Sequence, residues 1–253
     1  MEYFVGFLIA VVIALTGVGA GVITAPLLFY VMRLPLPIAV STALAYSASV
    51  KLVVVPIQII RKQVDYRILG WMVLGGLPGV IAGSMLFRHV SAHGPSMALT
   101  LSLGCIIILT SAWHIYRLYQ PTTITTPVTD HRRWLTAVMF PIGAEVSFSS
   151  SGAGVLGTVS LLSLTNLSTP QIVGTDLAFG LAITLVASGI HMYDGQYATT
   201  ILIKMALGGG VGSIFGSSCA LRIPNRYLRL ALSLLLITIG CKFCWDAFSI
   251  PKS

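Results

Sequence analysis

Two glycine-rich stretches with nearby hydroxyl groups have the clearest capacity for chemistry in this sequence. The first, TGVGAGVITAP, covers residues 16–26, and the second, SFSSSGAG, covers residues 147–154. Glycine lets the backbone approach a ligand closely, serine hydroxyls donate hydrogen bonds without a fixed charge, and a helix start offers free N–H groups to an anion. The candidate anion-binding residues are Gly19, Ala20, Gly21, Thr24, Ser149, Ser150, Ser151, Gly152 and Gly154.

Charged residues inside long apolar segments are a second set of candidates, because such residues are costly in a membrane and often functional. Lys51 could balance the charge of an anion or pair with a carboxylate, whereas Asp176 and Glu145 could carry protons. Thr42 and Thr175, which are equivalent under the duplication described below, join the candidate anion-binding residues. The alternative interpretations are structural ion pairing for the charged residues and close helix packing for the glycines and serines.

The composition places these residues in a membrane protein. Of 253 residues, 56% are hydrophobic and only 9% are charged, and the mean hydropathy is +0.92. A soluble domain carries about 25% charged residues, so this surface must face lipid. A bilayer-spanning helix needs roughly 20 apolar residues. The single spans expected are 38–60, 67–88, 97–119, 170–194, 199–220 and 226–248, and two longer apolar stretches are 3–32 and 134–166.

Several other readings of the composition are less favoured. The N-terminus has Glu2 and no basic residue before the apolar run, unlike a signal peptide. The net charge of +8 is expected to come from cytoplasmic loops rather than from a nucleic-acid surface. The four cysteines are expected to be small packing residues, and no metal or cofactor is predicted. Lys204 is expected to reach an interface, and His191 to be a solvated histidine at a helix end.

The chain contains an internal duplication. A shift of 133 positions aligns GAGV at 19–22 with GAGV at 152–155, and the register continues without a gap to GGLPGVIAGS (75–84) over GGGVGSIFGS (208–217). Glycines spaced four apart in these last blocks are predicted to be packing seams. The duplication predicts two repeats, residues 1–119 and 134–253, joined by the polar linker 120–133.

Loop charges predict that the second repeat is inverted. The loop 61–67 contains three basic residues, and its equivalent in the second repeat, 194–200, contains none. Conversely, the loop near Arg88 contains one arginine, and its equivalent region contains Arg222, Arg226 and Arg229. Basic loops stay cytoplasmic, and inversion requires an odd number of crossings in each repeat. We therefore expect 3–32 and 134–166 to be re-entrant hairpins of two short helices. The predicted fold is an all-α polytopic membrane protein with two inverted repeats, each a broken-helix hairpin plus three transmembrane helices. The linker 120–133 is expected in the cytoplasm and both termini outside.

The order of these motifs resembles the TauE/SafE family of membrane permeases, also called sulfite exporters. The resemblance is carried by GVGAGVITAPLL (17–28), PLPIAVSTALAYSASVK (35–51), QVDYRI (63–68) and GGLPGVIAGS (75–84), and by SGAGVLGTVSLL and TPQIVGTDLAFG in the second copy. It covers essentially the whole chain and implies gradient-driven transport of small sulfur-containing anions such as sulfite, sulfonates or sulfoacetate.

The expected function is therefore secondary transport of a small sulfur-containing oxyanion by alternating access, coupled to protons, in a bacterial inner membrane. The anion and the bilayer are the expected partners, nucleic acid is not, and a homodimer is an assembly that the sequence allows. Two alternatives remain at this point: an anion channel, and an intramembrane serine protease that would pair the serine run with His191.

Overall fold

The computed structural model describes residues 2–16, 20–93, 96–119, 132–149, 152–195, 197–219 and 225–249, and these residues form ten helices. Each expected single span overlaps one helix: α3 (Leu36–Ile60), α4 (Tyr66–His93), α5 (Ser96–Tyr119), α8 (Thr169–Tyr193), α9 (Thr199–Cys219) and α10 (Asn225–Ser249). Each expected hairpin contains two: α1 (Glu2–Thr16) with α2 (Ala20–Tyr30), and α6 (Arg132–Ser149) with α7 (Gly152–Leu164). The all-helical fold class is confirmed.

The helix surfaces are those of a membrane protein. In the described part of the chain, α3, α4, α8 and α9 are long and apolar enough to cross a bilayer, and α3 and α8 are the more buried of the four. Large apolar side chains point outward from the bundle, which suits contact with lipid. Examples are Phe4, Leu74, Met85, Leu109, Phe215 and Trp245.

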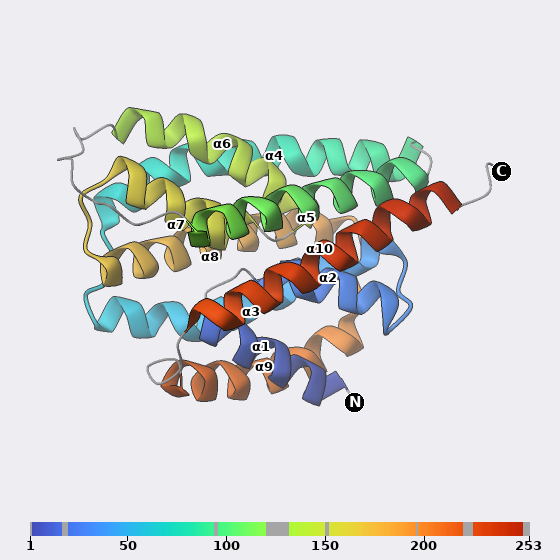
Figure 1. Ribbon diagram of the computed structural model, residues 1–253, viewed down its shortest axis with the longest axis horizontal. Coiled ribbons are helices and arrows are strands. Elements are labelled where there is room, and N and C mark those ends of the chain that lie inside the picture. The colour runs from blue at the N-terminus through green and yellow to red at the C-terminus, as the bar shows by residue number, and fades with distance from the viewer. Residues whose placement is uncertain are drawn as a thin grey trace.

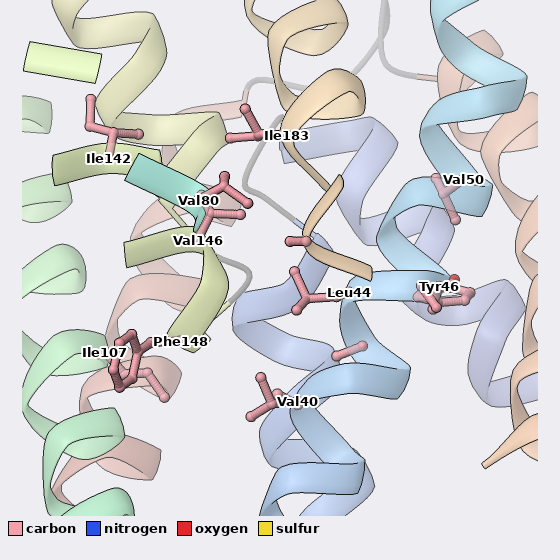
Figure 2. Packing of buried hydrophobic residues seen from close by; sticks show 14 of the residues in the cluster. Val40, Leu44, Tyr46, Val50, Val80, Ile107, Ile142, Val146, Phe148 and Ile183 are labelled. Atoms are coloured by element: carbon pink, nitrogen blue, oxygen red, sulfur yellow. The ribbon is translucent and has the colours of Figure 1, made fainter. Parts of the chain in front are cut away.

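The helices pack in pairs that join the two halves of the sequence (Figure 1). The pair α4–α6 forms one edge of the bundle and the pair α1–α9 forms the other, with α3 and α8 between them and α5 packed along α10. The core is apolar and shared by both halves. Figure 2 shows Val40 and Leu44 of α3 in the same cluster as Val80 of α4, Ile142 of α6 and Ile183 of α8.

Glycine seams bring the edge pairs together. A Cβ at any of five glycines would collide with a backbone carbonyl of the facing helix, so only glycine allows the observed approach. These glycines are Gly75, Gly79 and Gly83 of α4, against Thr136, Phe140 and Ala144 of α6, and Gly208 and Gly212 of α9, against Tyr3 and Phe7 of α1. The predicted role of these glycines as packing seams is confirmed.

Contacts between the halves recur with the halves exchanged. The Asp65 N–H donates to Thr175 Oγ1 at 3.0 Å, and the Ala198 N–H, 133 positions later, donates to Thr42 Oγ1 at 3.1 Å. These two bonds place the first turns of α8 beside the residues that follow α3, and the first turns of α3 beside the residues that follow α8. The helices α3 and α8 are therefore antiparallel.

The turns after α3 and α8 share a left-handed residue. Lys62 has φ 55° and Gly195, its equivalent, has φ 68°. After α3, the Gln63 N–H closes the turn by donating to the Gln58 carbonyl at 3.0 Å. Such an ending satisfies carbonyls that the helix itself leaves free. Glycine is the natural residue for this conformation, and only the second half uses it.

Candidate functional site

Asp176 is the centre of a polar cluster between α7 and α8. Its Oδ2 accepts a hydrogen bond from Thr158 Oγ1 at 2.8 Å, and its Oδ1 lies where a Cβ on Gly157 would be. Thr158 Oγ1 is also 2.8 Å from the Gly154 carbonyl, in the first turn of α7. Asp176 itself is 5% exposed. The predicted residues Gly154 and Asp176 are therefore linked through Thr158, which was not predicted.

The Thr158 hydroxyl has a single hydrogen and two acceptors. An ionised carboxylate and a backbone carbonyl can both only accept, so the hydroxyl donates to one of them at a time. If Asp176 is protonated, its own O–H can donate to Thr158 Oγ1, and the Thr158 hydrogen can then go to the Gly154 carbonyl. The orientation of this hydroxyl therefore depends on the protonation of Asp176.

The repeats differ at this site in a way that makes room for the carboxylate. The equivalents of Gly157 and Asp176 in the first half are Thr24 and Ala43. In the second half, the larger side chain is Asp176 on α8 and the glycine is on α7. In the first half, the larger side chain is Thr24 on α2 and the smaller one is Ala43 on α3. This exchange of sizes is visible in the aligned repeats, and it was the signal available for predicting Gly157.

Lys51 brings the opposite charge to the cluster from α3. It is 6% exposed, its charge interacts electrostatically with Asp176, and its Nζ has no hydrogen-bond partner among the described residues. The second carboxylate oxygen of Asp176, Oδ1, also lacks a hydrogen-bond partner there. Buried polar atoms are nearly always hydrogen-bonded in folded proteins. Buried charged groups of opposite sign with unpartnered atoms are the arrangement expected where a small charged ligand enters.

Thr42 and Thr175 are not brought together. Each is fully buried, and each accepts the backbone N–H bond from the opposite half described above. Ser41, beside Thr42, touches His191 near the far end of α8. At about 1.5 Å per residue, the two threonines lie roughly 20 Å apart along the α3–α8 pair. A small oxyanion can contact only one of them at a time.

Five further candidates lie in the short helices α2, α6 and α7. Ala20 and Gly21 begin α2, Ser149 ends α6 and Gly152 begins α7, while Thr24 is fully buried on α2. Gly19, Ser150 and Ser151 lie outside the described residues.

Two polar residues of α6 lie before the second interruption. Glu145 is partly buried. Ser147, a member of the predicted serine run, is fully buried and donates a hydrogen bond to the Val80 carbonyl of α4 at 2.9 Å. The Ser147 hydroxyl therefore contributes to packing between α4 and α6.

His191 is buried, and the expectation of a solvated histidine is wrong. The side chain is 3% exposed, its Nδ1 is 3.1 Å from Ser41 Oγ, and its ring packs edge-on against Phe87 with centroids 4.9 Å apart. The expectation relied on nearness to a helix end. It failed because the start of α3 and the side of α4 cover the last turns of α8.

Three further expectations concern residues away from the cluster. Lys204 Nζ forms an ion pair with Glu2 Oε2 at 2.8 Å, with both side chains partly exposed. Cys105 and Cys241 are exposed free thiols, and Cys244 is partly buried. Within the described residues, no group of three or more His, Cys, Asp or Glu side chains is placed to hold a metal ion.

Comparison with known proteins identifies relatives over nearly the whole chain. The sequence model of the family described as Sulfite exporter TauE/SafE matches residues 3–243. A Bacillus subtilis (strain 168) protein described as probable membrane transporter protein YjnA is 26% identical over 246 residues, which cover 94% of this chain and 96% of that protein. No solved structure matches.

Proposed function

The chain belongs to the Sulfite exporter TauE/SafE family and is a membrane transporter, and on this premise we propose that it moves a small sulfur-containing oxyanion together with a proton. The substrate class proposed is that of sulfite, sulfonates and sulfoacetate. Asp176 is the proton carrier, and Lys51 is the cation that the substrate faces. The serine-protease alternative is wrong, because the family consists of transporters and not of enzymes.

The observation that carries this proposal is the buried, unpartnered pair of charged atoms at Lys51 and Asp176. A single charge is expensive inside a membrane protein, so the site is stable only when its charges balance. In the empty site, the Lys51 ammonium balances the Asp176 carboxylate. When a monoanion binds, Lys51 balances the substrate and a proton neutralises Asp176. Both the empty and the loaded states are then neutral, which couples one proton to one monoanion.

Thr158 provides a physical link between that proton and the second interruption. With Asp176 ionised, the Thr158 hydroxyl stabilises the carboxylate through their 2.8 Å bond. With Asp176 protonated, the hydroxyl turns to the Gly154 carbonyl, also 2.8 Å away. Free N–H groups in the first turn of α7 are the anion-binding part of the proposal. Proton binding at Asp176 therefore changes the hydrogen bonding of the backbone that would hold the substrate.

The exchanged contacts between the halves support an alternating-access mechanism. Contacts that recur with the halves exchanged are those of a pseudo-twofold axis, and the opposite loop charges of the repeats favour an axis in the membrane plane. Inverted halves of this kind can adopt inward-open and outward-open states that are related by the pseudo-twofold axis through one central site. The seams α4–α6 and α1–α9 each join the two halves, so they are the contacts across which the halves would move.

Uptake by purified protein in liposomes tests the proposed function. Radiolabelled sulfite, sulfoacetate, taurine and sulfate are compared for exchange against the same unlabelled compound inside the vesicle. Saturable exchange of at least one sulfur-containing anion supports a carrier. Ohmic single-channel currents without saturable exchange would support the anion channel and contradict the proposal.

A further inference from the structure

Two buried polar atoms occupy equivalent positions near the ends of the two central helices. Gln58 of α3 and His191 of α8 are 133 positions apart in the sequence. Among the described residues, neither Gln58 Oε1 nor His191 Nε2 has a hydrogen-bond partner, although both atoms are buried. An unsatisfied polar atom in a protein interior costs about 1–3 kcal/mol. Of these two atoms, only the imidazole nitrogen of His191 can bind a proton at ordinary pH.

His191 lies at the end of the central pair opposite to Asp176. The two residues are about 22 Å apart along α8, at about 1.5 Å per residue. Beyond His191, the Asp194 carboxylate at the end of α8 forms an ion pair with Arg88 of α4 at 3.5 Å, and the Arg88 side chain is 67% exposed. The histidine is therefore the most buried member of a polar group that extends from the bundle interior to its surface.

The hydrogen bonds of His191 indicate which nitrogen carries the hydrogen. Ser41 Oγ donates to the Pro37 carbonyl at 2.8 Å, so its single hydrogen is already used. The 3.1 Å contact with His191 is then a bond donated by Nδ1–H to Ser41 Oγ. In the neutral ring this leaves Nε2 with a free lone pair. A proton can bind at Nε2 without breaking the bond to Ser41, so the ring can change its charge without moving.

We propose that His191 is a second proton-binding site, which takes up or releases the coupled proton at the end of the α3–α8 pair opposite to Asp176. The proposal rests on the proposed proton-coupled transport. The groups that face the ring are Ser41 of α3, Phe87 of α4 and Asp194 at the end of α8, with Arg88 of α4 paired to Asp194. Burial of the ring opposes its charged form, the Asp194 carboxylate partly offsets this effect, and Asp194 is itself paired with Arg88. His191 would thus be the proton station nearest to water on its side.

The variant His191→Gln separates proton exchange from substrate movement. Its amide can still donate a hydrogen bond to Ser41 but cannot bind a proton. Exchange of labelled for unlabelled anion at equal pH requires no net transfer of protons across the membrane, whereas net uptake driven by a pH gradient requires a proton to be released on the far side in every cycle. We expect His191→Gln to keep anion exchange within about twofold and to lose net uptake by about tenfold or more.

His89→Gln is the matched control, because His89 is an exposed histidine of the neighbouring helix α4. The rates of anion exchange and of net uptake by His89→Gln should both equal those of the wild type. If His191→Gln keeps the wild-type ratio of net uptake to exchange, the inference is wrong and the proposed function stands. If the wild type exchanges no sulfur-containing anion, the proposed function itself fails.

A second variant keeps the inference testable if His191→Gln is not recovered as folded protein. Ser41→Ala retains the imidazole but removes the hydroxyl that fixes its Nδ1–H. We expect its ratio of net uptake to exchange to fall about threefold, a smaller loss than that of the histidine variant. An unchanged ratio in a folded Ser41→Ala protein overturns the inference.

Discussion

Replacing Asp176 by asparagine should uncouple anion binding from proton binding. Asparagine has nearly the same size and can still accept the Thr158 hydrogen bond through its carbonyl oxygen, but it carries neither charge nor exchangeable proton. On the proposed charge balance, a monoanion binds next to Lys51 in the wild type only when Asp176 takes up a proton. In the variant, Lys51 is already without its counter-charge, and the anion alone restores neutrality.

The size of the effect follows from the burial of the pair. Removing one partner of a buried ion pair costs about 3–5 kcal/mol, because the remaining charge is left uncompensated. Lys51 and Asp176 are 6% and 5% exposed, but Lys51 Nζ forms no direct hydrogen bond to Asp176, so the lower end of this range applies here. Anion binding to Asp176→Asn relieves that cost, and affinity should rise on the order of 100-fold relative to the wild type with ionised Asp176. Over the pH range in which Asp176 is ionised in the empty site, wild-type affinity should strengthen by about tenfold for each unit that the pH falls, because one proton binds with the anion.

Titration calorimetry in two buffers of different ionisation enthalpy measures both the affinity for the anion and the number of protons taken up with it. The wild type should take up one proton with each bound monoanion, and Asp176→Asn should take up none and bind independently of pH. Glu145→Gln, which changes the other predicted proton carrier, is the matched control and should retain proton uptake. Proton uptake that persists in Asp176→Asn, or that disappears only in Glu145→Gln, would refute the assignment of Asp176.

Three further predictions test the surroundings of the site and the topology. Gly157→Ala should abolish transport, because its Cβ would displace the Asp176 carboxylate, whereas Gly189→Ala on α8, where a Cβ meets no atom within 4 Å, should transport at the wild-type rate; anion exchange in liposomes measures both. Thr158→Val should weaken the dependence of binding on pH and slow net uptake by about tenfold, because a hydrogen bond to a charged group contributes about 1.5–3 kcal/mol; uptake at several pH values checks this. Ile60→Cys and Tyr193→Cys, at equivalent helix ends that are 80% and 91% exposed, should be labelled by a membrane-impermeant maleimide from opposite sides in a background without the native cysteines. Labelling of both from the same side would contradict inversion.

Much of the helix layout could be predicted from the sequence, because lipid imposes long apolar helices and the duplication supplies each expectation twice. The division of each long apolar stretch into two short helices could be expected because glycine and serine clusters in the middle of an apolar run are unfavourable in a helix. The packing glycines were found from their spacing of four, which places them on one helix face. These are local properties, so a single sequence suffices to recognise them.

The composition of the site was harder to predict because it depends on which helices cross. Nothing local to Thr158 or Gly157 distinguishes them from other small residues of α7; their importance comes from the carboxylate of α8 beside them. For the same reason Thr42 and Thr175, equivalent in sequence, were grouped in one site although antiparallel packing separates them. The burial of His191 could not be predicted because burial at a helix end is decided by the neighbouring helices, here α3 and α4.

The central claim is that one proton moves with one monoanion and that neither the empty nor the loaded site carries a net charge. It is tested most directly by net anion uptake into liposomes that contain a pH-sensitive dye, with the pH gradient and the membrane potential imposed separately. We predict that an inward proton gradient drives accumulation with one proton entering per monoanion, and that a membrane potential alone drives none. Accumulation driven by potential without movement of protons would contradict the account.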